Sequence, residues 1–100
     1  MKVFIAPQFP VADRGEGGIR RVVEAQIKYL PEFGIEVVDS IAHADLTVGH
    51  GILAPRRKDI PYVNINHGMH WRDYQWGLWA HEVNGMVRDA MLQADAITVP

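Results

Sequence analysis

Two histidines, each followed by glycine, are the residues of this chain best suited to chemistry near neutral pH. His50 ends the run "DLTVGH", and His67 ends the run "YVNINH". An imidazole can donate to a hydroxyl or a phosphate, or carry a proton near neutral pH. The alternative is that each ring only packs against or caps a strand end, and "VGHGI" can equally be a tight turn. His67 has the stronger case because it directly follows a strand pattern, so we take it as the candidate catalytic residue.

A glycine-rich segment, "DRGEGGIRR" at residues 13–21, offers a different chemistry. Gly17 and Gly18 directly precede an amphipathic pattern and should lie at the start of a helix. Unpaired N–H groups and the positive end of the helix dipole attract anions there, and glycine allows a phosphate to approach the backbone. Arg20, in the first turn, can add positive charge. The spacing matches neither the dinucleotide fingerprint nor a P-loop, so an ordinary flexible connection is an equal alternative.

The segment 70–79 is rich in tryptophan and tyrosine. Aromatic faces suit sugar rings as well as protein interfaces, because they combine a large apolar area with a polar edge. The alternative, slightly favoured, is that these rings cover the core or a second domain. We take four residues as candidates for ligand binding: His50, Trp71, Arg72 and Tyr74.

A metal site built from His67, His70 and His81 is conceivable but disfavoured. Their spacing does not match the H-E-x-x-H pattern, and the chain has no cysteine to supply a thiolate ligand. We therefore expect no bound metal and no cofactor.

Strand-like and helical patterns alternate along the chain and must position these residues. Strands are predicted at residues 2–6, 35–38, 45–51, 62–68 and 96–99, and helices at 19–30 and 83–94. Pro31 should keep Leu30 out of the helical conformation, and Gly34 should provide a left-handed stop. This alternation predicts one α/β domain with a mostly parallel sheet of about five strands and right-handed crossovers. The glycine segment, His50 and His67 would then share the carboxyl edge of the sheet, where ligands bind.

Composition excludes several classes of function. The 100 residues suffice for one hydrophobic core, and the net charge of −2 gives no basic field for nucleic acid. No apolar run approaches the length of a membrane span and no signal peptide is evident, so a cytoplasmic protein is expected. The basic stretch "RRK" at 56–58 is interpreted as a solvated loop face, with peripheral membrane contact as a minor alternative.

The order of these segments resembles a known family. A strand leads into the Gly17-Gly18 loop and a long helix, then into "GIEVV", "DLTVGHG", "PYVNINHG" and a helix ending in "ADAITVP". Together they resemble the N-terminal, three-layer Rossmann-like domain of GT-B fold glycosyltransferases, particularly the retaining family 4 enzymes. The resemblance covers nearly the whole chain. The short connection between the third and fourth strands departs from the family and puts the placement of the third strand in question.

The resemblance implies roles for particular residues. Gly17 and Gly18, with Arg20 beside them, would face the diphosphate of a nucleotide-sugar donor, and His67 would contact the donor sugar near the reacting centre. The N-terminal domain of this family mainly binds the acceptor, so a glycan or small-molecule acceptor would contact these four residues: His50, Trp71, Arg72 and Tyr74. Transfer would proceed with retention and without a metal. The donor itself would be held by a C-terminal domain, so residues 1–100 are expected to be a truncated, acceptor-side domain that is inactive alone.

Two other interpretations stay open. A non-catalytic α/β module could oligomerise, as a homo-oligomer, through its sheet edge and tryptophan segment. A weaker one is a small phosphate or nucleotide binder that uses only the glycine segment.

Overall fold

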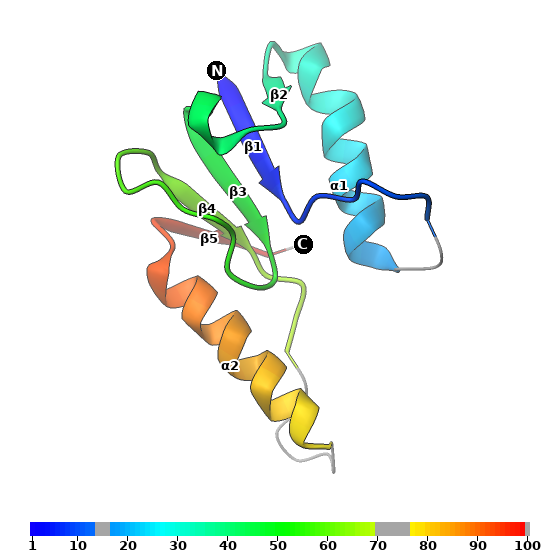
Figure 1. Ribbon diagram of the computed structural model, residues 1–100, viewed down its shortest axis with the longest axis vertical. Coiled ribbons are helices and arrows are strands. Elements are labelled where there is room, and N and C mark those ends of the chain that lie inside the picture. Colours follow the sequence, from blue (N-terminus) through cyan, green and yellow to red (C-terminus); the bar gives the residue numbers. More distant parts are fainter. Residues whose placement is uncertain (14–16, 70–76, 100) are drawn as a thin grey trace.

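Parallel strands form one sheet in the spatial order β2-β1-β3-β4-β5 (Figure 1). In sequence order they are β1 (Lys2–Ala6), β2 (Glu36–Val38), β3 (Leu46–His50), β4 (Tyr62–Ile65) and β5 (Ala96–Thr98). The computed structural model describes residues 1–13, 17–69 and 77–99. Every neighbouring pair in this sheet is parallel. The predicted α/β class and the five-stranded parallel sheet are therefore confirmed.

The two predicted helices are present, with shifted boundaries. Helix α1 spans Gly18–Tyr29 and α2 spans Leu78–Gln93, so α2 begins five residues before the predicted start at residue 83. The prediction for Leu30 is wrong, because this residue keeps a right-handed helical conformation. The chain passes directly from α1 into a 3-10 turn, Leu30–Phe33, in which Pro31 takes an early position where its missing N–H costs little. Gly34 ends that turn with a left-handed φ of 77°, as predicted.

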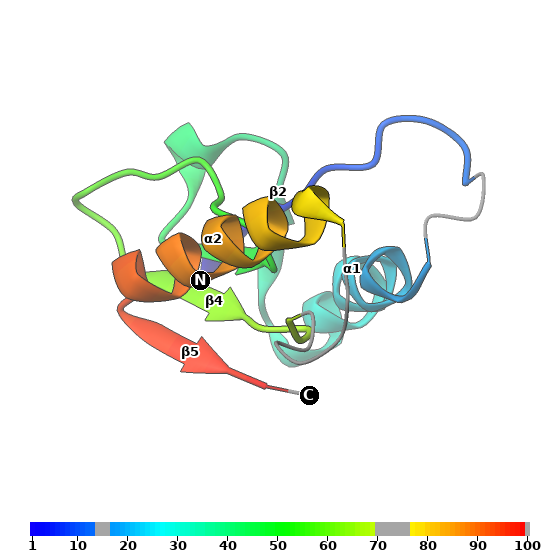
Figure 2. The same cartoon turned by 90° about the horizontal axis from the view of Figure 1, so that it is seen from below.

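Alternating residues of β1 face two separate parts of the core. Val3 and Ile5 pack with Val23 of α1 and with Val48 of β3. Phe4 and Ala6 turn the other way, into a cluster that includes the fully buried Tyr62. Burial of both faces explains why β1 reads as a continuous apolar run and not as an alternating one. Helix α2 packs against β4 (Figure 2).

The connection between β3 and β4 has no helix, yet the two strands are parallel neighbours. Ala54 from this connection is buried in the cluster around Tyr62, and Ile60 packs against the same cluster. The loop thus covers the sheet where a crossover helix would normally lie, which answers the question raised by its short length.

In the basic stretch of this connection, Arg56 and Lys58 are exposed, as predicted, and Arg57 is half-buried. The Arg57 guanidinium donates to the backbone carbonyls of Ile41, Ala42 and Ala44, at 3.1 to 3.3 Å. Arg56 donates to the Gln93 carbonyl at the end of α2. These two arginines therefore connect the loop to the turn before β3 and to the end of α2. Within the described residues, neither helix has both the length and the apolar character needed to cross a membrane.

Candidate functional site

The side chains of His50 and His67 meet at the carboxyl edge of the sheet. Strands β3 and β4 are adjacent, with His50 in register with Ile65, so the residue two positions beyond Ile65 comes back over the end of β3. The His50 Nδ1 and His67 Nε2 atoms lie 2.8 Å apart. The two rings are inclined by 27°, with centroids 5.0 Å apart. Two residues that sequence patterns placed on one edge are thus joined by a hydrogen bond.

A third residue, Gln26 of α1, extends this contact. Its Oε1 lies 2.8 Å from the His50 Nε2 atom, so both nitrogens of His50 are engaged. Gln26 belongs to none of the sequence motifs that mark the predicted site. It lies seven residues after Ile19 and three after Val23, which places it on the sheet-facing side of the helix. A polar side chain on the otherwise apolar side of α1 is the sequence signal by which Gln26 could have been identified.

His50 is buried, with 2% of its surface exposed. Burial and, to a smaller extent, the neighbouring His67 together lower the pKa of His50 from 6.5 to about 4. Removing an imidazolium from water is costly, and a second positive ring nearby would repel it. His50 is therefore neutral at physiological pH and acts as a fixed hydrogen-bonding link.

The turn after β4 holds His67 in place. The Asn66 Oδ1 atom accepts the Gly68 N–H at 2.6 Å, and the Asn66 Nδ2 atom donates to the Met91 Sδ atom of α2 at 2.9 Å. Gly68 has a φ of 112°, a conformation that side-chain-bearing residues rarely adopt. The "N-H-G" sequence therefore encodes a tight turn that fixes the histidine between β4 and α2.

A pocket of about 380 Å³ lies beside this pair of histidines. His67 and His50 are among its lining residues. The remaining wall is mainly apolar and comes from the segment after β1, the start of α1, the loop after β3 and α2: Phe9, Ile19, Ile52, Val83 and Val87 among others. The volume lies within the usual range for small-molecule sites, and an apolar wall with a few polar groups is typical of them.

The glycine segment begins α1 next to this pocket. Gly17 has a φ of 87° and caps the helix, with no side-chain hydrogen bond to the first-turn N–H groups. Among the described residues, a Cβ atom built on either Gly17 or Gly18 would have no neighbour within 4 Å. Ile19, directly after them, lines the pocket. The start of α1 therefore lies beside the pocket.

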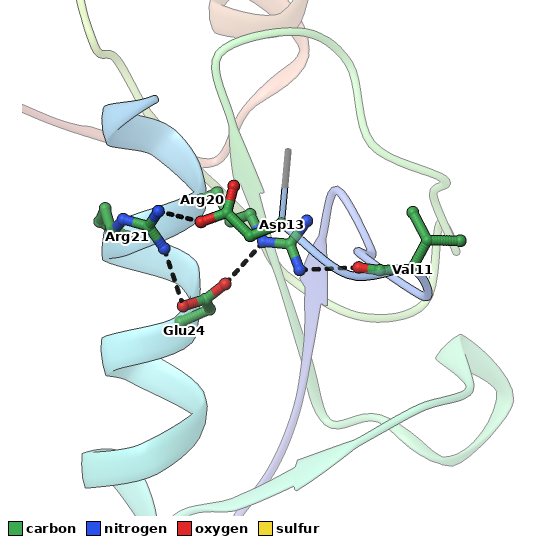
Figure 3. Close-up of polar contacts among 5 residues, drawn as sticks. All are labelled: Val11, Asp13, Arg20, Arg21 and Glu24. Atoms are coloured by element: carbon green, nitrogen blue, oxygen red, sulfur yellow. Dashed lines mark hydrogen bonds and ion pairs between the residues drawn. The ribbon is translucent and has the colours of Figure 1, made fainter. Parts of the chain in front are cut away.

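Arg20 has a structural role in addition to its predicted contact with a diphosphate. Its guanidinium is buried and donates to the Val11 carbonyl at 2.7 Å and to the Glu24 Oε1 atom at 2.6 Å (Figure 3). It also lies over the Phe9 ring. These contacts tie the segment after β1 to α1. The hydrogen bond from Arg20 also lowers the pKa of Glu24 below its ordinary value. The role of Arg20 at a diphosphate stays a prediction.

The other predicted site residues are placed as follows. Trp71, Arg72 and Tyr74 lie outside the described residues, so their proposed acceptor contacts stay predictions. The nitrogens of His50 are both engaged within the protein, and its acceptor contact stays a prediction as well. His70, one of the three histidines of the disfavoured metal site, also lies outside the described residues. Within the described ranges, no group of three or more His, Asp or Glu side chains could hold a metal ion.

Comparisons with protein-family models, with curated proteins and with solved structures found no match to this chain.

Proposed function

We propose that residues 1–100 form the acceptor-side part of a glycosyltransferase, with a three-layer, Rossmann-like organisation of the GT-B type. The reaction would move a sugar from a nucleotide-diphosphate donor to a glycan or small-molecule acceptor, with retention. One observation carries this proposal: His67, held by His50, shares a pocket at the carboxyl edge of a parallel sheet with the start of α1. That edge is where open α/β sheets bind their ligands.

The start of α1 suits the diphosphate of the donor. Gly17 and Gly18 leave room for phosphate oxygens to approach the backbone, and no acidic side chain in the first turn opposes them. The first-turn N–H groups and the helix dipole favour negative charge at this point. As the bond between the sugar and the diphosphate breaks, negative charge develops on the diphosphate. Fixed hydrogen-bond donors stabilise that charge and so lower the barrier.

His67 suits a contact with the sugar or with the acceptor. Its ring is partly exposed to the pocket, while the turn at Asn66–Gly68 and the bond to His50 restrict its orientation. A fixed imidazole can hold a hydroxyl group near the reacting centre without having to be ordered during the reaction. A second domain, which would hold the nucleotide, completes the proposed enzyme.

The test is sugar transfer by the product of the complete open reading frame that encodes residues 1–100. It would be incubated with a panel of UDP-, GDP- and ADP-sugars, and release of the nucleoside diphosphate would be measured. Gly18→Leu should lower turnover at least about tenfold, because the side chain would occupy the space of the diphosphate. His67→Ala should lower turnover by a similar factor or more, since positioning is worth several kcal/mol.

Matched controls separate these effects from damage to the fold. Gly85→Leu places the same side chain at another glycine with no neighbour within 4 Å, in the middle of α2. His43→Ala removes an exposed histidine from the turn before β3. Both controls should keep normal turnover. Normal turnover in Gly18→Leu and His67→Ala as well, or no transfer with any donor, would refute the proposal.

A second function, assembly through the sheet edge, is favoured by a separate observation. All three residues of β5 are exposed, and among the described residues this strand pairs only with β4. Ile97 in its centre is 50% exposed. An uncovered edge with an apolar residue is a template for pairing with another strand. If a second copy binds there, light scattering of the chain should show a dimer that Ile97→Lys converts to a monomer; a monomeric wild-type chain would exclude it.

A further inference from the structure

Gln26, His50 and His67 form one hydrogen-bonded chain that runs from α1 to the pocket. Gln26 Oε1 lies 2.8 Å from His50 Nε2, and His50 Nδ1 lies 2.8 Å from His67 Nε2. The three residues come from α1, the end of β3 and the turn after β4. His50, in the middle, is 2% exposed, so water cannot substitute for either partner.

The Gln26 oxygen determines which atom donates and which accepts in both hydrogen bonds. An amide oxygen only accepts, and a neutral imidazole has one donor and one acceptor nitrogen. If Gln26 Oε1 faces His50, then His50 must carry its proton on Nε2, and its Nδ1 must accept. The only donor that His67 can offer to that atom is its own Nε2–H.

We propose that Gln26 and His50 are positioning residues that fix His67 in the tautomer with its proton on Nε2. The Nδ1 atom of His67 is then a bare acceptor and is the ring nitrogen left for a ligand. An acceptor nitrogen binds a group that donates a hydrogen, such as a hydroxyl, and not an oxygen of a phosphate. His67 and the start of α1 therefore bind different chemical groups in one pocket.

The environment of His50 keeps this arrangement intact near neutral pH. A protonated His50 would have to donate from both nitrogens, which would reverse the bond to His67. Burial opposes that protonation and, with the neighbouring His67, lowers the pKa of His50 to about 4.

This inference deepens the proposed function, and its meaning for catalysis rests on it: the ligand group at His67 Nδ1 would be a sugar or acceptor hydroxyl. The tautomer itself is independent of any sugar transfer. It can be measured on the chain without a donor. Failure of the transfer assay would leave the tautomer result standing, and the reverse also holds.

The experiment is a long-range ¹H–¹⁵N spectrum of the imidazoles in the full chain, labelled with ¹⁵N-histidine and recorded at pH 8.5. The His67 signals would be assigned from their loss in His67→Ala. The wild-type spectrum should show His50 and His67 each protonated on Nε2, with Nδ1 bare. Gln26→Met removes the accepting oxygen at similar size, so His67 should change to a mixture of both tautomers. Gln93→Met, the same exchange at an exposed position of α2, should leave the wild-type pattern unchanged.

A rescue variant keeps the test decisive if Gln26→Met does not fold. Gln26→Glu has only accepting oxygens, so it cannot take the opposite orientation, and it should preserve the wild-type tautomer of His67. Three outcomes would overturn the proposal: a His67 protonated on Nδ1 in the wild type, an unchanged pattern in folded Gln26→Met, or a changed pattern in Gln26→Glu.

Discussion

At the amino edge of the sheet, two aspartates perform the same task on two different strand pairs. Asp45, before β3, accepts the Lys2 N–H at 2.8 Å, and its own N–H donates to the Lys2 carbonyl at 2.7 Å. Asp95, before β5, does the same with Tyr62, at 2.8 Å in both directions. Each carboxylate satisfies the first N–H of a neighbouring strand, which the ladder would leave without a partner.

The carboxyl edge uses its polar residues differently. There, His50 and His67 bond to each other and to Gln26, and part of the His67 ring faces a pocket. At the amino edge, the two aspartates thus use their carboxylates to bond the backbone of neighbouring strands. At the carboxyl edge, the His67 ring remains in contact with the pocket. The difference indicates that polar residues at a strand end become a candidate site only where the backbone does not use them.

The largest expected effect is a dependence of stability on pH that arises at the carboxyl edge. The unfolded chain binds a proton at His50 near pH 6.5, whereas the folded chain binds it only near the lowered pKa of about 4. The free energy of unfolding should therefore be highest above pH 6.5 and fall as the pH drops toward 4, by on the order of 3 kcal/mol. Urea unfolding at pH 7.5, 5.5 and 4.5 measures this.

A variant that cannot titrate isolates the contribution of His50. His50→Gln should be less stable than the wild type at pH 7.5 but should lose most of the slope between pH 6.5 and 4.5. His43→Gln, at an exposed histidine, should keep the wild-type slope. The pKa values of Glu24 and Asp59 are lowered from their ordinary values of 4.5 and 3.8. These carboxylates therefore change the free energy of unfolding only at a pH below the range in which His50 titrates in the unfolded chain. An equal slope in His50→Gln would show that the carboxyl edge is not the source.

The second effect tests the packing between the two edges. A Cβ atom on Gly49 would lie 2.7 Å from the Tyr62 hydroxyl and 3.0 Å from the Ala54 Cβ atom. Because the Tyr62 ring is fully buried and cannot move aside freely, Gly49→Ala should lower the free energy of unfolding by about 2 kcal/mol. Gly85→Ala, in open space within a helix, should instead raise it by up to about 1 kcal/mol. Equal changes in urea midpoint for the two variants would contradict this account.

The third effect concerns the amino edge alone. Asp45→Ala and Asp95→Ala should each cost about 1 kcal/mol, because each leaves a strand N–H without its acceptor. Asp45→Asn and Asp95→Asn keep an accepting oxygen and should recover most of the loss. The histidine spectrum described above should be the same in all four variants. A changed His67 tautomer in any of them would show that the two edges are coupled.

The smallest effect comes from Arg56, which supports the amino edge from outside. Its guanidinium lies 3.5 Å from Asp95 and 5.5 Å from the centre of the Tyr62 ring. Partly exposed ion pairs and cation–π contacts contribute little, so Arg56→Met should cost about 0.5 kcal/mol in thermal or urea unfolding. The loss should shrink in 1 M salt, since salt screens the ion pair. A cost above that of Asp95→Ala would mean that Arg56 has a larger task than this contact.

The sequence predicted each strand and both helices because these depend on local patterns. "KVFIA" is apolar throughout and forms the doubly covered β1, and Gly34 stops the turn after α1 as expected. The details of α1 were less predictable. Val22 and Ile27 belong to its apolar pattern but are 37% and 47% exposed, while the charged Arg20 is buried. The long aliphatic stem of arginine and its bonds to Val11 and Glu24 make that exchange possible.

By itself, the sequence determined the parallel sheet, its carboxyl edge and the two histidines placed there, because hydrophobic periodicity and turn residues act over a few positions. Only the tertiary structure decided that His50 and His67 touch, that Gln26 completes their chain, and that Arg20 fastens a loop. These contacts join residues 9 to 24 positions apart, and they depend on strand order, register and the rotation of α1. No local pattern encodes those three quantities, since each is set by the packing of the whole core.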